Sequence, residues 1–359
     1  MTYRLWLDFE TYSETPIVHG TYRYAANAEI TLFAWAIDED PALVWDLTSG
    51  DPMPYDLEVA LRDPGCEVWA HNSMFDRTVM RYAMPEWCPP LSRWRDTMVQ
   101  AMCHSLPGKL ATLCDVLGIA EDKAKSKRGG QLVQLFCKPR PATSKLRRAT
   151  RDTHPTEWAE FVDYARLDVE AMREVNRKLP TWNYSGDELA LWHLDQLIND
   201  RGIAVDLDLA NAALKAVGDE QAVLAERTAD MTNGEVQTAT QRNAMLEHML
   251  AEYGIALPDL TMATVERRLE DPDIPQAMKE LLRVRLQAST TSTSKYKALV
   301  RACNLDGRLR GLLQFAGAGR TARWSGRTFQ PQNLSRGVLH GPIYDEAIEA
   351  IKGGYLRLL

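Results

Sequence analysis

The chain has 359 residues, 45% hydrophobic and 25% charged, a composition typical of globular proteins. This length predicts two or three domains, each able to bury a core. No apolar run reaches membrane-spanning length and the first residues do not resemble a signal peptide, so we expect no membrane association. The six cysteines have no C-x-x-C spacing, which argues against a zinc site and favours reduced thiols in a cytoplasm.

The net charge of −7 gives no global sign of nucleic-acid binding, but the cations are unevenly distributed. Residues 122–151 contain ten Lys or Arg against one acid, and residues 295–337 contain nine against one. Two such stretches in an acidic protein predict local surfaces that bind the phosphate backbone of a nucleic acid. The alternative for each stretch alone is a solvated charged face.

The first half of the chain reads as strands followed by helices. Residues 2–11, TYRLWLDFET, alternate as a strand does. Further strands are predicted at 31–38, 42–47 and 66–70, and helices at 55–62, 74–83, 96–104, 110–117 and 157–179. Acids stand at the strand ends, so we expect a mixed α/β sheet with its site at one edge.

After Pro180 the pattern changes to a mainly helical second domain. Helices are predicted at 186–201, 208–232, 240–253, 261–269 and 275–303, with a short extended link at 201–206. Residues 306–336, rich in Gly, Arg and Gln, predict a loop or hairpin, and 344–352 an amphipathic stretch. We expect no internal repeat.

The first strand ends in Asp8 and Glu10, which are two residues apart and therefore point to the same face. Like charges that close repel one another unless a cation lies between them. Hard divalent cations such as Mg²⁺ prefer oxygen ligands of this kind. The alternative is an acidic strand end that faces solvent.

Two further segments supply acids at a spacing of four residues. Asp76 follows Asn72 at the start of a helix, where the helix dipole alone would also favour a carboxylate. Asp168 follows Tyr164, so both lie on one helical face, although a surface acid and a core aromatic would fit as well. The ordered set D-x-E, N-x-x-x-D and Y-x-x-x-D over about residues 1–180 resembles the DEDD exonuclease superfamily, in its tyrosine branch. The histidine branch is disfavoured because the nearest upstream histidine, His154, lies too far from Asp168.

This resemblance implies a ribonuclease H-like exonuclease domain, with a mixed sheet flanked by helices, and a two-metal reaction that uses Mg²⁺, with Mn²⁺ as an alternative. Asp8, Glu10 and Asp168 would hold the ion that carries the attacking water, and Asp8 would also touch the second ion. Asp76 would act through the water shell of that second ion. The implied catalytic residues are Asp8, Glu10, Asp76, Tyr164 and Asp168, the four acids being the metal ligands.

Around the metals, the resemblance implies roles for neighbouring side chains. Tyr164, together with Glu10, would orient the attacking water through its hydroxyl group. Thr11, Asn72 and Phe75 would contact the terminal nucleotide.

A second resemblance lies near the other end of the chain. Residues 319–325, GRTARWS, followed by 330–334, QPQNL, resemble the T-x-R-x-S and Q-N-L segment of family A DNA polymerases, the polymerase I type. The resemblance implies contacts with a primer–template, with Arg323 in the minor groove, where acceptors are shared by all base pairs. Residues 192–206 resemble the entry to the polymerase region in phage-type members, and about 207–303 would be the thumb. The implied DNA-binding residues are Arg320, Arg323, Gln332 and Asn333.

These resemblances predict three domains: an exonuclease domain at 1–180, a helical thumb-like region at 181–305 and the incomplete start of a palm at 306–359. The D-x-S-x-x-E and H-D-E-like stretches that supply the metal-binding aspartates of the palm do not occur. We therefore expect a truncated or split polymerase that has no polymerase activity by itself.

The sequence thus predicts the N-terminal part of a phage-like family A DNA polymerase that carries a proofreading 3′→5′ exonuclease. Its expected partners are single-stranded 3′ ends and primer–template DNA, together with a C-terminal polymerase portion or a processivity factor. A phage or prophage origin in the cytoplasm of a bacterial host is expected. The alternatives are a free-standing exonuclease of the same superfamily, including RNA trimmers of the ribonuclease D kind, and a non-catalytic DNA-binding or clamp-like subunit.

Overall fold

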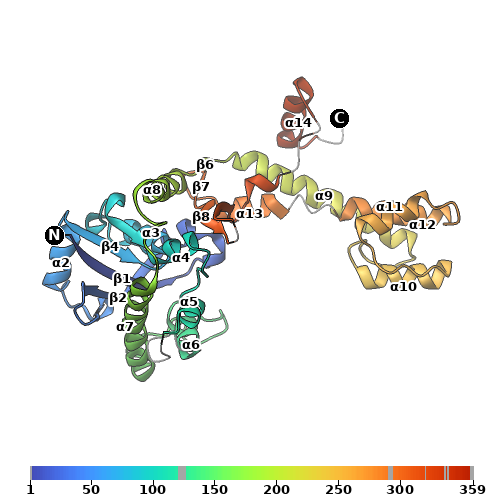
Figure 1. The fold of residues 1–359 in the computed structure, drawn as a ribbon. Coiled ribbons are helices and arrows are strands. Elements are labelled where there is room, and N and C mark those ends of the chain that lie inside the picture. Colours follow the sequence, from blue (N-terminus) through green and yellow to red (C-terminus); the bar gives the residue numbers. More distant parts are fainter. Residues whose placement is uncertain are drawn as a thin grey trace. The chain divides into compact units, whose positions relative to one another are not determined.

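The computed structural model describes residues 2–119, 127–289, 294–319, 321–334, 337 and 339–355. These residues form two compact units, one within 1–205 and 302–334 and the other within 206–301 and 335–359. The chain therefore leaves the first unit after residue 205 and returns to it at 302 (Figure 1). Their roles as exonuclease, thumb and palm stay predictions.

The first unit is built on a five-stranded sheet in the order β3-β2-β1-β4-β5. The strands are β1 (Tyr3–Ser13), β2 (Ala28–Ile37), β3 (Leu43–Asp46), β4 (Cys66–Ala70) and β5 (Trp94–Asp96). β1, β2 and β3 pair antiparallel, whereas β1 pairs with β4, and β4 with β5, in parallel. This mixed sheet confirms the predicted ribonuclease H-like class, although β5 was too short for its pattern to be visible in the sequence.

Helices flank this sheet (Figure 1). They are α1 (Thr21–Ala25), α2 (Tyr55–Arg62), α3 (Ser73–Ala83), α4 (Thr97–Cys103), α5 (Leu110–Leu117), α6 (Lys127–Phe136), α7 (Pro155–Lys178) and α8 (Gly186–Arg201). Short 3₁₀ helices are η1 (Ile17–His19), η2 (Leu47–Ser49), η3 (Pro85–Trp87) and η4 (Leu91–Arg93). The predicted helices are confirmed to within about two residues, and α1 and α6 are additional.

The core of the first unit explains why β1 can carry charged side chains at its end. Leu5 and Leu7 are fully buried, and so is Phe33 of the neighbouring β2. Phe9 packs edge to face on Phe33, with 4.5 Å between the ring centroids. This packing fixes the register of β1 and therefore the direction of the side chains of Asp8 and Glu10.

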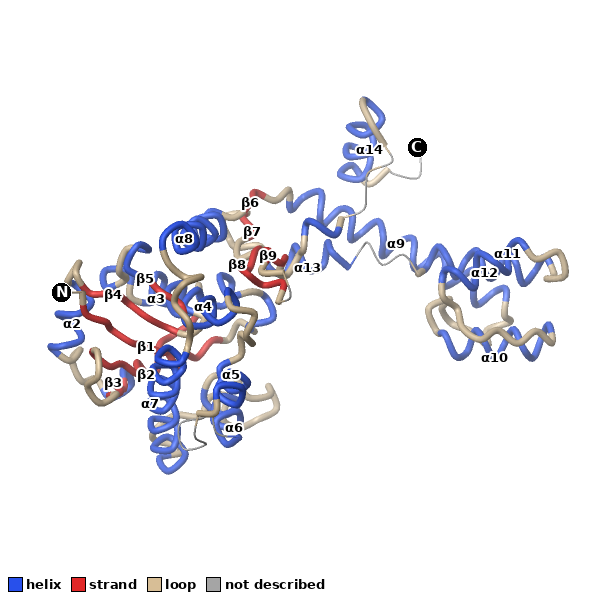
Figure 2. The backbone as a smooth tube through the Cα atoms, viewed as in Figure 1, coloured by secondary structure: helices blue, strands red, loops and turns tan. Residues whose placement is uncertain are grey.

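The segment that returns to the first unit forms two small sheets. β6 (Ile203–Ala204) pairs with β7 (Arg308–Leu309), and β8 (Leu313–Ala318) pairs with β9 (Arg323–Gly326) as an antiparallel hairpin. The 3₁₀ helix η6 (Pro331–Asn333) follows. All described strands lie in the first unit, as the red segments of Figure 2 show. The prediction of a loop or hairpin at 306–336 is confirmed for its described residues.

The second unit is helical, as predicted. It contains α9 (Leu207–Met231), α10 (Arg242–Tyr253), α11 (Met262–Glu270), α12 (Gln276–Ala288), most of α13 (Ser294–Ala302) and α14 (Pro342–Gly353). The predicted helix 275–303 appears as α12 and α13, and 290–293 lie outside the described residues. Its core is made of Met and Leu side chains, including Met245, Met249, Met278, Leu281 and Leu282. None of the helices described in either unit is both long and apolar enough to cross a bilayer.

Candidate active site

Three of the predicted acids form a tight cluster. Asp8 and Glu10 come from β1, and Asp168 comes from α7, which packs against β1 and β2. One carboxylate oxygen from each of the three lies within 4.8 Å of the others. Glu10 and Asp168 are only 7% and 3% exposed. Buried like charges this close are stable only with a compensating cation or proton, and an all-oxygen donor set suits a hard divalent ion.

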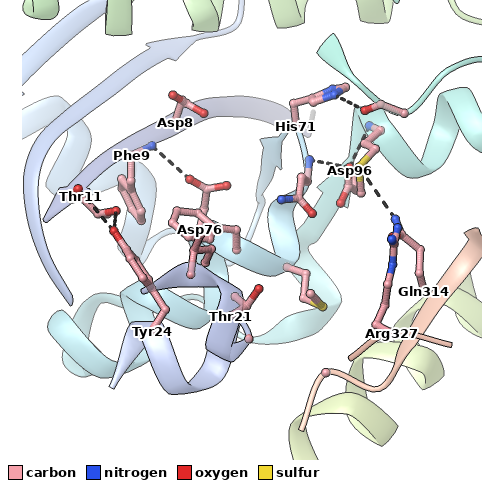
Figure 3. A pocket seen from close by; sticks show the side chains of 18 of the residues that line it. Asp8, Phe9, Thr11, Thr21, Tyr24, His71, Asp76, Asp96, Gln314 and Arg327 are labelled. Carbon is pink, nitrogen blue, oxygen red and sulfur yellow. Dashed lines mark hydrogen bonds between the residues drawn. The ribbon is translucent and has the colours of Figure 1, made fainter. Parts of the chain in front are cut away.

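Asp76, the fourth predicted acid, lines one cavity together with Asp8 and Glu10. It lies outside the tight cluster of three acids. Its Oδ1 accepts a hydrogen bond of 3.1 Å from the backbone N–H of Phe9, which links α3 to β1 (Figure 3). Burial first, and then the negative charge of Asp8, raises the pKa of Asp76 well above its usual range. A cation bound in the cavity would oppose this shift and favour the charged form.

Tyr164 lies one helical turn before Asp168 and lines the same cavity. Its ring is buried, and its centroid lies 6.3 Å from that of Phe161 in a stacked arrangement. On another side the ring contacts α6 at Gly129, where a Cβ atom would come within 2.0 Å of a ring carbon. Gly129 therefore leaves the space that this orientation of the tyrosine needs.

The three residues predicted to contact a terminal nucleotide also line the cavity. Thr11 is hydrogen-bonded through its hydroxyl group to the hydroxyl of Tyr24 at 2.7 Å (Figure 3). The ring centroid of Phe75 lies 5.7 Å from that of Tyr24. Asn72 precedes α3 in a left-handed conformation, with φ of 66°. The structure thus gathers residues from β1, from α3 and from the position directly before α3 in one cavity.

Asp96 is a residue of this site that the sequence pattern did not single out. It ends β5 and accepts hydrogen bonds from the backbone N–H groups of Asn72 and Ser73 at 3.0 and 2.8 Å. It also caps α4 by accepting from the N–H groups of Met98 and Val99. Burial raises its pKa, although these donors oppose the shift. An aspartate at the first position of the predicted helix 96–104 is an N-cap signal that could have identified this structural role.

The cavity that Asp8, Glu10 and Asp76 line has a volume of about 1120 Å³. Its wall includes His71, whose Nε2–H donates to the carbonyl oxygen of Gly108 at 2.9 Å, and Tyr24 from α1. Cations also line it: Lys109, Lys138 and Arg327. A cavity with carboxylates at its base and cations on its wall can hold an anionic ligand over a metal site.

The predicted primer–template residues are not brought to this cavity. Arg323 is exposed on β9. Gln332 packs against Gly326, where a Cβ atom would lie 2.1 Å from its Nε2, and Asn333 donates to Gln330 at 2.8 Å. These three residues are close in sequence and belong to the same hairpin region. Arg320 lies outside the described residues.

The mixed sheet and the clustered acids together define an α/β fold of the ribonuclease H-like class with a candidate metal site. No family model matches the sequence. The chain is 34% identical to a DNA polymerase of Bacillus phage SP02, in a match of 359 residues that covers 98% of this chain and 54% of the phage protein. The chain therefore spans about half the length of this curated relative.

Solved structures add a comparison of the fold. The POL domain of Pol1 from M. smegmatis, in complex with DNA primer-template and dNTP, matches with a TM-score of 0.59 and 15% identity, covering 93% of this chain and 52% of that chain. Escherichia coli RNase D, an exoribonuclease, matches more weakly, with a TM-score of 0.34 and 15% identity. This match covers 80% of this chain and 70% of that chain. The chain is thus similar in sequence to a phage DNA polymerase and in fold to the POL domain of a Pol1 protein.

Proposed function

We propose that this chain carries a metal-dependent 3′→5′ exonuclease that proofreads DNA as part of a phage-type DNA polymerase. The observation that carries the proposal is the cluster of Asp8, Glu10 and Asp168, whose oxygens lie within 4.8 Å of one another. Asp8 and Glu10 line the same cavity as Asp76 and Tyr164. The relationship to a DNA polymerase supports DNA as the substrate.

The residues of the cavity have complementary tasks in this reaction. Asp8, Glu10, Asp168 and, more remotely, Asp76 would hold two divalent ions, Mg²⁺ or Mn²⁺. Bound there, the ions would stabilise the charge that develops on the attacking and leaving oxygens. Tyr164 and Glu10 would orient the attacking water, because a buried hydroxyl and a carboxylate can fix its position and accept its proton.

The remaining contacts would hold the end of the strand. Thr11, Asn72 and Phe75 line the cavity and would position the terminal nucleotide, Phe75 by stacking on its base. A paired terminus would have to unpair before it enters, so frayed or mismatched ends are the preferred substrate. Arg323, Gln332 and Asn333 would instead contact a primer–template outside this cavity.

Degradation of a 5′-labelled oligonucleotide tests the proposal. The substrate is offered single-stranded, as a primer–template with a mismatched 3′ end, and as RNA of the same sequence, each with Mg²⁺ or Mn²⁺. A stepwise ladder from the 3′ end of DNA is expected, and it disappears with EDTA and in the Asp8→Ala, Glu10→Ala double variant. Added dNTPs give no extension by this chain alone.

Three outcomes would contradict the proposal. A ladder that persists in the double variant would point to a contaminating nuclease. DNA binding without any cleavage would favour the non-catalytic binding subunit, and faster trimming of RNA than of DNA would favour an enzyme of the RNA-processing kind.

A further inference from the structure

The hairpin formed by β8 and β9 belongs to the wall of the cavity that holds the acids. Five residues of this region, here called the hairpin wall, line that cavity together with Asp8, Glu10 and Asp76: Leu313, Gln314, Phe315, Arg327 and Thr328. They are separated from β1 by about 300 positions in the sequence. Residues beside the polymerase-like stretches 319–325 and 330–334, although not those stretches themselves, therefore lie on the same surface as Asp8, Glu10 and Asp76.

The hairpin is held to the first unit by α8. The side-chain Oδ1 of Asn199 accepts from the N–H of Leu313 at 2.9 Å, and its Nδ2 donates to the carbonyl of the same residue at 3.0 Å. The N–H of Gly311 also donates to the carbonyl of Asn199. These bonds fix the start of β8, so the hairpin wall has a defined position beside the cavity.

The side chains of the hairpin wall suit a nucleic-acid strand. Gln314 and Arg327 extend toward the cavity (Figure 3). The backbone N–H of Arg327 donates to Leu312 at 2.7 Å, which anchors the residue, while its guanidinium forms no ion pair with a carboxylate in the described ranges. A cation in that position is available for a phosphate, and Phe315 and Leu313 supply apolar surface.

We propose that the hairpin wall is part of the substrate site of the exonuclease and that Arg327 binds a phosphate of the strand upstream of the scissile bond. This inference rests on the proposed exonuclease function. It makes Arg327 a positioning residue, because it holds the strand and does not touch the reacting atoms. The residues that precede and separate the two polymerase-like stretches then serve the exonuclease.

The test compares two substrates with the full chain and Mg²⁺ or Mn²⁺. One is a 16-nucleotide single-stranded DNA, and the other is the p-nitrophenyl ester of thymidine 5′-monophosphate, a phosphodiester with no upstream strand. For Arg327→Gln we expect KM for the oligonucleotide to rise about tenfold with kcat changed less than about twofold, and the salt dependence of KM to weaken by about one phosphate contact. Hydrolysis of the ester is unchanged, and Arg327→Lys restores most of the oligonucleotide KM.

Arg62→Gln is the matched control, because Arg62 is exposed on α2, pairs with Glu58 and does not line the cavity. The inference is wrong if Arg327→Gln matches this control on the oligonucleotide, or if it slows both substrates equally, which would indicate a structural effect. Absence of metal-dependent hydrolysis of either substrate by the unmodified chain would instead overturn the proposed exonuclease itself.

Discussion

The two units bury ionisable groups in different ways. Among its described residues, the first buries five carboxylates, namely Glu10, Asp76, Asp96, Asp168 and Asp195. In the described part of the second unit no Asp or Glu is buried, and its core consists mainly of Met and Leu side chains. Because a buried carboxylate destabilises the fold unless it is hydrogen-bonded, protonated or paired with a cation, the first unit maintains its acids at a cost in stability.

The acids of the first unit are themselves of two kinds. Asp96 accepts backbone hydrogen bonds at the starts of α3 and α4, so both oxygens of its buried carboxylate have hydrogen-bond donors within the fold. Asp8, Glu10 and Asp168 gather their charges at one point instead. A bound cation would stabilise this cluster of three acids, whereas Asp96 needs none.

The largest effect is expected for Asp168→Asn. This change removes one charge from the cluster at nearly constant volume, so the cation loses a ligand and exonuclease activity should fall by about 10³-fold or more. Because the repulsion between the acids is also reduced, the Tm without metal should stay the same or rise. The increase in Tm that Mn²⁺ produces in the unmodified chain should shrink at the same time.

Thermal unfolding with and without Mn²⁺, beside the nuclease assay, checks this expectation. Asp152→Asn is a suitable control, because Asp152 is exposed at the turn before α7. A loss of Tm without metal in Asp168→Asn, comparable to that of a core substitution, would mean that Asp168 supports the fold and not a metal site.

The next effect concerns an ion pair that links α3 to α8 in the first unit. Arg77 donates to both carboxylate oxygens of Asp200 at 2.8 and 2.9 Å, and their side chains are only 3% and 14% exposed. Tyr22 also donates to Asp200 at 2.6 Å. Although burial opposes the shift, the hydrogen bonds and charge of Arg77 lower the pKa of Asp200. Arg77→Ala leaves Asp200 with the more exposed Arg81, at 2.7 Å, as its remaining cationic partner, and should reduce the free energy of unfolding by about 3 kcal/mol.

The pH dependence of this effect has a definite sign. Since the pKa of Asp200 is lower in the folded chain, the pair stabilises at neutral pH and its contribution is lost as the pH falls through that lowered value, below the ordinary Asp range near ~3.9. Urea unfolding from pH 3 to 7 should therefore show the two proteins converging toward low pH. A difference that is constant over this range would show that Arg77 acts through packing alone.

Leu282→Ala offers the contrast from the second unit. Leu282 is fully buried in its core, so the cavity left behind should cost about 2–5 kcal/mol. Degradation of single-stranded DNA should nevertheless be unchanged at temperatures where that unit stays folded, because the acids belong to the other unit. A loss of activity in Leu282→Ala at those temperatures would break the distinction between the two units.

The sequence alone predicts local features of the fold better than features that depend on contacts between distant residues. Alternation along β1 predicted the strand and the shared face of Asp8 and Glu10, and helices such as Leu110–Leu117 and Gly186–Arg201 were predicted to the residue. These features depend on periodicity within a few turns. That Asp8, Glu10 and Asp168 approach one another required the motif resemblance, because no local pattern tells how α7 packs on the sheet.

The features that were missed depend on contacts between distant residues. β5 has three residues and is a strand because β4 lies beside it. Gly129 is required by the ring of Tyr164, which is 35 positions away in the sequence. The hairpin wall reaches the cavity through hydrogen bonds from Asn199, and neither composition nor spacing indicates such bonds.

The smallest effect expected belongs to Asp195 of α8, a neighbour of the hairpin wall. Its Oδ2 accepts from Gln196 and Asn199, while its Oδ1 is buried without a hydrogen-bond partner among the described residues. Burial raises its pKa to about 7, although both hydrogen bonds oppose the shift. The folded chain therefore binds a proton more tightly than the unfolded chain, and this stability is lost as the pH rises from the ordinary Asp value toward 7.

Asp195→Asn removes the charge that becomes uncompensated at high pH. We expect the variant to gain about 1–4 kcal/mol relative to the unmodified chain between pH 5 and pH 8, measured by urea unfolding. Asp152→Asn, in which the exposed acid has no such environment, should give no comparable trend. A difference that does not vary with pH would mean that Asp195 is charged throughout and stabilised by its neighbours. It would then resemble Asp96, whose buried carboxylate is stabilised by hydrogen bonds within the fold.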